Sequence, residues 1–128
     1  MPDHRPIEPN DAPPPLGPYS PAMGFERLIF VSGQGARDPL TGKLPDGIEA
    51  QTEQVLRNVQ GILRAAGSDL PYVLRCGVFL IDMREFAQMN TVYKRMFGEH
   101  RPARTTVQAA ALPGEGLLVE IDCMAYVP

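Results

Sequence analysis

Two stretches with the periodicity of amphipathic helices constrain the fold of this chain most, because each is bounded by start and stop signals. In the first, Asp46 and Glu49 form a capping-box-like pair, and Gly67 follows as a stop. In the second, Asp82 can cap the start, and Gly98 ends it. These signals, with the apolar spacing between them, predict one helix that begins after Asp46 and ends before Gly67, and a second that begins after Asp82 and ends before Gly98. The apolar residues at helical spacing are Ile48, Val55, Leu56, Val59, Ile62, Leu63 and Ala66, and then Phe86, Met89, Tyr93, Met96 and Phe97.

Runs typical of strands lie before, between and after these helices. The segment 28–31 is β-branched and aromatic and leads into a glycine turn. Two further runs, about 104–110 and 117–126, are joined by a short link with two glycines, which favours an antiparallel pair. The order strand, helix, strand, helix, strand, strand predicts an α+β domain with a mixed sheet and both helices on one face. The strand predicted over 73–81 has an apolar face made of Leu74, Cys76, Val78 and Leu80.

Composition limits the class of protein. The 128 residues are enough for one domain with a real core, and we expect a proline-rich N-terminal segment over 1–15 and a single domain over 16–128. The net charge of −3 argues against nucleic acid as the main partner, since phosphate binding needs a basic face. No apolar run approaches the length of a membrane-spanning helix, so we expect no membrane partner. The polar, proline-rich N-terminus is unlike a signal peptide, and we therefore expect a cytoplasmic protein.

Few side chains are suited to metal or disulfide chemistry. Cys76 and Cys123 lie in different apolar strands, which favours buried free thiols over a disulfide. His4 and His100 are far apart and share no ligand spacing with the cysteines. There is also no phosphate-binding glycine loop and no serine elbow. The sequence therefore predicts no metal site.

One arginine and one glutamate stand out in the last two predicted strands, because their neighbours look buried. An arginine such as Arg104 can grip a carboxylate through two parallel hydrogen bonds, and a glutamate such as Glu120 can act as a general base in partly apolar surroundings. Alternation places Thr106 on the same face as Arg104. If the two strands pair, these polar faces lie side by side. They then form either a site for a small carboxylic acid that reacts with water or a solvated face with a cross-strand ion pair.

Three further positions are candidate ligand contacts, each with a structural alternative. Asn90 falls inside the apolar stripe of the second helix, where a buried amide needs a partner in a loop backbone or in a ligand. Ser32 and Gly33 end a hydrophobic strand and form at least a turn. Tyr19 lies in a loop, where packing is the simpler explanation of an aromatic side chain.

Several short motifs in this order and spacing resemble the Rid family, the reactive intermediate deaminases that are also called the YjgF family. The resemblance runs from about residue 16 to the end of the chain. The motifs taken together in this order are far more specific than any one of them alone. The motifs are Gly17-Pro18-Tyr19, Ser32-Gly33-Gln34, Asn58-Val59 with Ala65-Ala66-Gly67, Asn90-Thr91-Val92-Tyr93, Pro102-Ala103-Arg104 and Val119-Glu120-Ile121.

The resemblance implies a chorismate-mutase-like fold, a homotrimer and ligand clefts between neighbouring subunits. It further implies a cofactor-free enzyme that hydrolyses 2-imino acids, or enamines such as 2-aminoacrylate, to 2-keto acids and ammonia. Arg104 would bind the carboxylate, and Glu120 would lie beside the reacting water. The other ligand contacts that the resemblance implies are Tyr19, Ser32, Gly33 and Asn90.

The chain departs from many members of this family at Thr106, where a cysteine is common. A hydroxyl group there can still donate a hydrogen bond to a ligand. Other functions remain open for such a chain: a non-enzymatic trimer that binds small carboxylates or acts as a chaperone, an RNA-cleaving translation inhibitor, or a deaminase dedicated to one pathway. The acidic net charge disfavours the RNA function.

Overall fold

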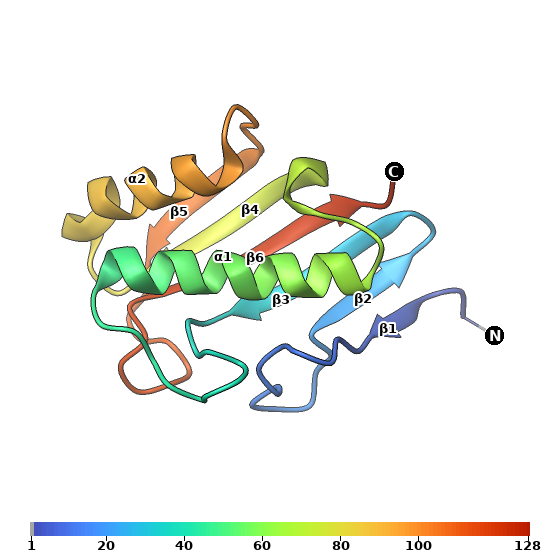
Figure 1. Cartoon of the computed structure of the whole chain (residues 1–128), viewed down its shortest axis with the longest axis horizontal. Helices are drawn as coiled ribbons and strands as arrows, with labels where there is room; N and C mark the ends of the chain where they lie inside the picture. Colours follow the sequence, from blue (N-terminus) through green and yellow to red (C-terminus); the bar gives the residue numbers. More distant parts are fainter. Residues whose placement is uncertain (1) are drawn as a thin grey trace.

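The computed structural model describes residues 2–128 as one mixed sheet of six strands with two helices on one face (Figure 1). The predicted α+β class and the placement of both helices are confirmed. The elements are β1 (Arg5–Ile7), β2 (Ala22–Phe25), β3 (Leu28–Gln34), α1 (Ile48–Ala65), β4 (Val73–Leu80), α2 (Phe86–Phe97), β5 (Ala103–Gln108) and β6 (Val119–Tyr126).

The strand order is β1-β2-β3-β6-β4-β5, so the last strand lies in the middle of the sheet. β6 pairs antiparallel with both β3 and β4, whereas β5 pairs parallel with β4 at the sheet edge. The predicted antiparallel pair of the last two strands is therefore wrong. β5 ends at Gln108 and β6 begins only at Val119, and the intervening segment carries the chain past β4 instead of turning back as a hairpin.

The core lies between the helices and the sheet. The apolar stripe of α1 is fully buried, as is the helix-facing side of β6, whose members are Val119, Ile121, Cys123 and Ala125. Alternation along β6 turns its even-numbered residues, Glu120 among them, to the other face. No helix within residues 2–128 is long and apolar enough to cross a membrane.

Local structure differs from the prediction at three places. α1 begins after Gly47, with φ of 88° and no side-chain cap, so Asp46 is not its N-cap. Asp82 does cap, but it caps the short 3-10 turn Met83–Glu85 that leads into α2. Leu74 is 45% exposed, because a register shift between Val73 and Arg75 interrupts the alternation of β4.

The N-terminal part of the chain adds two strands that the sequence did not signal. β1 pairs with β2, and β2 pairs with β3, which extends the sheet to its other edge. Among the residues that the structure describes, no helix covers the face of the sheet opposite α1 and α2 (Figure 1). Phe30 and Val107 point to this open face and are 39% and 42% exposed.

The loop after β3 is fastened to α1 by Asn58, which is buried. Its Nδ2 donates to the carbonyl oxygens of Gly35 at 3.0 Å and Arg37 at 2.8 Å, while its Oδ1 accepts from Gln54 at 2.9 Å. Since Gly35 and Arg37 line a pocket described below, this amide links the helix to the shape of that pocket.

Asn58→Ala should lower the free energy of unfolding by about 1–3 kcal/mol, because it leaves two carbonyl groups without their donor. Urea unfolding followed by circular dichroism measures the change. Gln88→Ala removes an exposed amide from α2 and should cost less than about 0.5 kcal/mol. Equal losses in the two variants would show that the Asn58 hydrogen bonds do not hold the loop.

Candidate active site

Glu120 lies on the open face, in the middle of the sheet. It is opposite Phe79 of β4, and on its other side it approaches Gly33 of β3. A Cβ atom at position 33 would lie 2.8 Å from the carboxyl carbon of Glu120, closer than a real Cβ atom can come. Glycine at position 33 therefore leaves the space that the glutamate side chain occupies.

The half-buried Glu120 carboxyl group has a raised pKa. Burial is the larger cause, because it disfavours the charged form, and the negative charge of Asp122 on the same face is the second. Asp122 is held in place because its Oδ1 accepts a hydrogen bond from the backbone N–H of Gly77 at 2.8 Å. A carboxyl group whose pKa is raised toward neutrality is suited to general acid–base chemistry.

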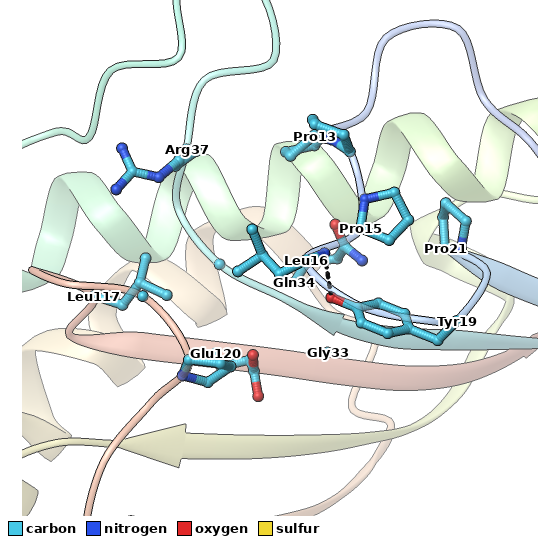
Figure 2. A pocket seen from close by; sticks show the side chains of 14 residues that line it. Pro13, Pro15, Leu16, Tyr19, Pro21, Gly33, Gln34, Arg37, Leu117 and Glu120 are labelled. Carbon is cyan, nitrogen blue, oxygen red and sulfur yellow. Dashed lines mark hydrogen bonds between the residues drawn. The ribbon is translucent and has the colours of Figure 1, made fainter.

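A pocket of about 120 Å³ opens beside Glu120 (Figure 2). Tyr19, Leu16 and Leu117 border it together with Glu120, and Figure 2 shows these side chains arranged around a common space. Most of the remaining lining is proline and glycine, including Pro13, Pro14, Pro15, Gly33, Gly35 and Pro113.

Hydrogen bonds to groups of the loop before β2 fix two of the predicted ligand contacts, Tyr19 in that loop and Ser32 in β3. The Tyr19 hydroxyl accepts a hydrogen bond from the backbone N–H of Leu16 at 3.2 Å, drawn as a dashed line in Figure 2. The Ser32 hydroxyl donates to the carbonyl oxygen of Ser20 at 2.7 Å. Tyr19 therefore presents its ring to the pocket, while Ser32 ties the loop to β3.

Arg104 lies on the opposite face of the sheet, near its far edge. It pairs with Cys76 of β4, which in turn lies opposite Cys123 of β6, and both cysteines are buried on the helix side. Its guanidinium carbon lies 4.7 Å from the centre of the Tyr93 ring and 5.6 Å from that of Phe86. Cation–π contacts with these two rings of α2 orient the guanidinium group.

The surroundings of Arg104 leave it available for an anion. Within residues 2–128 no carboxylate forms an ion pair with it. Asn90, Lys94 and Arg101 line the same shallow cleft, and Thr106 follows Arg104 on the same face of β5. The Oδ1 of Asn90 is buried and has no hydrogen-bond partner in this part of the chain, which is rare and indicates an incomplete site.

The predicted site residues thus fall into two groups on opposite faces of the sheet. The expectation that the polar faces of Arg104 and Glu120 lie side by side is wrong, and so is the alternative of a cross-strand ion pair between them. β4 separates the two strands, and parallel pairing turns Arg104 toward the helices. The open-face group is Tyr19, Ser32, Gly33 and Glu120, and the helix-face group is Asn90, Arg104 and Thr106.

Sequence reasoning missed part of the pocket lining. Leu16 and Leu117 are single apolar residues in segments rich in proline and glycine, where no periodicity marks them as part of a site. The hydrogen bond of Asp122 to Gly77 depends on the register of β4 against β6, which the sequence does not reveal. Tyr93 was identified only as a member of an apolar stripe.

Asp122→Asn should lower the pKa of Glu120, because it removes a nearby negative charge and retains an oxygen that can accept the Gly77 hydrogen bond. Carbon-13 NMR titration of the glutamate carboxyl groups measures the shift. Glu49→Gln removes one negative charge from the exposed first turn of α1 and should leave the Glu120 titration unchanged. An unchanged Glu120 pKa in Asp122→Asn would contradict the coupling.

Comparison with known proteins places this chain in a family. The family model described as Endoribonuclease L-PSP matches residues 9–127. A RutC family protein of Pyrococcus horikoshii is 46% identical, over 91% of this chain and 92% of its own length. The 2-iminobutanoate/2-iminopropanoate deaminase of Mus musculus is 42% identical, over 93% of this chain and 88% of its own.

The solved structure of Escherichia coli TdcF with bound serine matches with a TM-score of 0.90 and 36% identity, and the match covers 95% of this chain and 98% of that one. A match of this quality along nearly the whole chain extends to the order of the strands and to the placement of both helices. Together with the ordered motifs and the sheet that carries them, these likenesses show that the chain belongs to the Rid family, which the Endoribonuclease L-PSP model describes.

Proposed function

We propose that this protein hydrolyses 2-imino acids and their enamine tautomers, such as 2-aminoacrylate, to 2-keto acids and ammonia. The observation that carries the proposal is the half-buried Glu120 carboxyl group, with its raised pKa, at a partly apolar pocket. The unpaired Arg104 supplies a group that can bind the substrate carboxylate. The deaminase relative in mouse and the serine bound by the Escherichia coli relative support the same class of ligand.

The reaction needs only groups that this chain carries. An iminium carbon is already electrophilic, so water can add to it once a base takes a proton from that water. Glu120 takes the proton as the new C–O bond forms, and then returns it to the nitrogen. The C–N bond breaks with its electron pair leaving on ammonia, and Glu120, again a carboxylate, takes the hydroxyl proton as the keto group forms. Arg104 holds the substrate against the water, which supplies proximity.

This mechanism requires two chains at each site. Arg104 and Glu120 lie on opposite faces of one sheet, with β4 between their strands, so a single subunit cannot bring them together. The open face exposes apolar side chains, including Phe30 and Val107, that a neighbouring subunit can cover. A neighbour that covers this face with its own Arg104 edge completes the site, and repeating the contact around a ring gives the homotrimer.

The trimer predicts a mass of about three times 14.0 kDa in sedimentation equilibrium at micromolar concentration. Val107→Glu places a charge on the exposed face of β5 and should shift the distribution toward monomer, with a parallel loss of hydrolysis. Leu40→Glu is the matched control, since Leu40 is 86% exposed and lies in a loop away from the sheet face. A monomeric wild-type protein with full activity would contradict the shared site.

Glu120→Gln tests the base directly, because it keeps the shape of the side chain and removes its ability to accept a proton. The rate of 2-iminobutanoate hydrolysis should fall about 100- to 10,000-fold. Affinity for 2-ketobutyrate, measured by calorimetry on the same preparation, should be retained or increased. Hydrolysis at the wild-type rate would remove Glu120 from the mechanism.

Arg104→Ala should reduce hydrolysis and 2-ketobutyrate affinity together, because both depend on the carboxylate contact. Loss of a charge-assisted hydrogen-bonded contact costs about 1.5–3 kcal/mol, or roughly 10- to 150-fold in affinity. Arg104→Lys should restore little, since a point charge lacks the planar fork. Wild-type affinity in a folded Arg104→Ala trimer would assign the carboxylate to another group.

The non-enzymatic alternatives predict different results for the same variants. A binding protein would show keto-acid affinity and no imine hydrolysis in the wild type. An RNA-cleaving protein would be sensitive to phosphate and salt, yet the chain has a net charge of −3 and a carboxylate at its pocket. The imine assay on the wild-type protein separates these functions from the proposed one.

A further inference from the structure

We propose that the apolar end of the Glu120 pocket, between the proline segment 13–15 and Leu117, receives the substrate side chain and selects imino acids with branched aliphatic side chains. The inference rests on the proposed function and adds the substrate class to it. Leu117 and Leu16 are then the residues that determine specificity.

The size of the pocket fits such a side chain. Its volume of about 120 Å³ is several times the share of one water molecule, about 30 Å³. It is somewhat smaller than an engineered apolar cavity of about 150 Å³ that binds benzene. A methyl side chain would leave most of this space unfilled, whereas a four-carbon branched side chain would occupy it.

Leu117 forms a rigid wall of this pocket. The residues on either side of it are both held by Gln51 of α1, which is buried. The Gln51 Nε2 donates to the carbonyl oxygen of Gly116 at 3.0 Å, and its Oε1 accepts from the N–H of Leu118 at 2.8 Å. The backbone that carries Leu117 is therefore held by the helix, and the leucine side chain is itself buried, as a specificity wall requires.

Glycine at position 35 leaves the space that the Leu117 side chain occupies at the edge of the pocket. A Cβ atom there would lie 3.0 Å from Cδ2 of Leu117, so even an alanine would push the leucine. At the other end of the pocket Gly33 makes room for Glu120 in the same way. The two glycines of β3 and its following loop thus separate a reacting end from an apolar end.

The opposite wall comes from the N-terminal segment. Prolines 13–15 are stiff, and the Leu16 backbone is tied to the Tyr19 hydroxyl at 3.2 Å. Leu16 is 71% exposed, so its side chain has apolar surface free to contact a ligand. Because this wall is already ordered, binding a side chain against it costs little additional entropy.

The apolar end offers almost nothing to a polar side chain. Within residues 2–128, the charged groups that line the pocket are Glu120 and Arg37. The Arg37 guanidinium donates to the carbonyl oxygen of Gly42 at 3.1 Å, and Figure 2 shows it directed away from Glu120. The uncharged polar side chains of the lining, Gln34 and Tyr19, already take part in hydrogen bonds with the Ser32 carbonyl oxygen and the Leu16 N–H. An imino acid with a hydroxyl or carboxylate in its side chain would therefore lose hydration there for little gain.

Kinetics on a substrate series test the subsite. Imines of alanine, 2-aminobutanoate and leucine are generated in the assay by an amino-acid oxidase, and kcat/KM is measured for each. The wild type should prefer the leucine imine to the alanine imine by at least about 10-fold, since a buried methylene is worth about 10-fold or more.

Leu117→Phe fills the space and should reduce that preference at least about 10-fold. Leu40→Phe, at an exposed loop site, should leave the preference unchanged.

A second variant and a binding measurement keep the test independent of turnover. Leu16→Ala alters an exposed side chain, and it should weaken calorimetric binding of 4-methyl-2-oxopentanoate more than binding of pyruvate. Equal wild-type affinity for these two keto acids, or equal effects of Leu16→Ala on both, would overturn the subsite even if hydrolysis is observed. Tighter binding of the branched acid without hydrolysis of any imine would retain the subsite and overturn the proposed reaction. An unchanged preference for the leucine imine in a Leu117→Phe variant that remains trimeric and active would also overturn the proposal.

Discussion

The insertion of β6 between β3 and β4 is the constraint on which the rest of the site depends. It puts Glu120 in the middle of the sheet, with Gly33 on one side and Phe79 on the other, and alternation turns it to the face that no helix covers. The same insertion leaves β5 at the edge, paired in parallel with β4, and so turns Arg104 to the helix side. The carboxylate and the guanidinium are therefore kept apart within one chain.

That separation explains the two unusual electrostatic features. Within residues 2–128 Arg104 forms no ion pair, and its guanidinium group lies over the rings of Phe86 and Tyr93. The Asn90 oxygen beside it is buried without a donor in the same part of the chain. On the other face, Glu120 is half-buried next to Asp122, and burial and that negative charge both raise its pKa. Each half lacks what the other supplies, as expected of a site that two subunits complete.

The helices and their faces could be predicted from the sequence because helical periodicity and stop glycines are local signals. The identities of the candidate site residues came from ordered short motifs, which a family resemblance makes specific. Strand pairing could not be derived, because the neighbours of β6 are set by contacts between distant segments and the link before it resembles a hairpin. β1 and β2 are short and flanked by proline and glycine, so alternation within them is too brief to detect. The pocket wall at Leu16 was missed for the same reason.

The most direct test of the shared site is complementation between two inactive variants. Arg104→Ala and Glu120→Gln chains are mixed under denaturing conditions, refolded as trimers, and assayed for hydrolysis of 2-iminobutanoate. If each site takes its arginine from one chain and its glutamate from the next, random assembly of an equal mixture restores about a quarter of the wild-type sites. No recovery in mixed trimers of confirmed mass would show that both residues must act from the same chain, which contradicts the account.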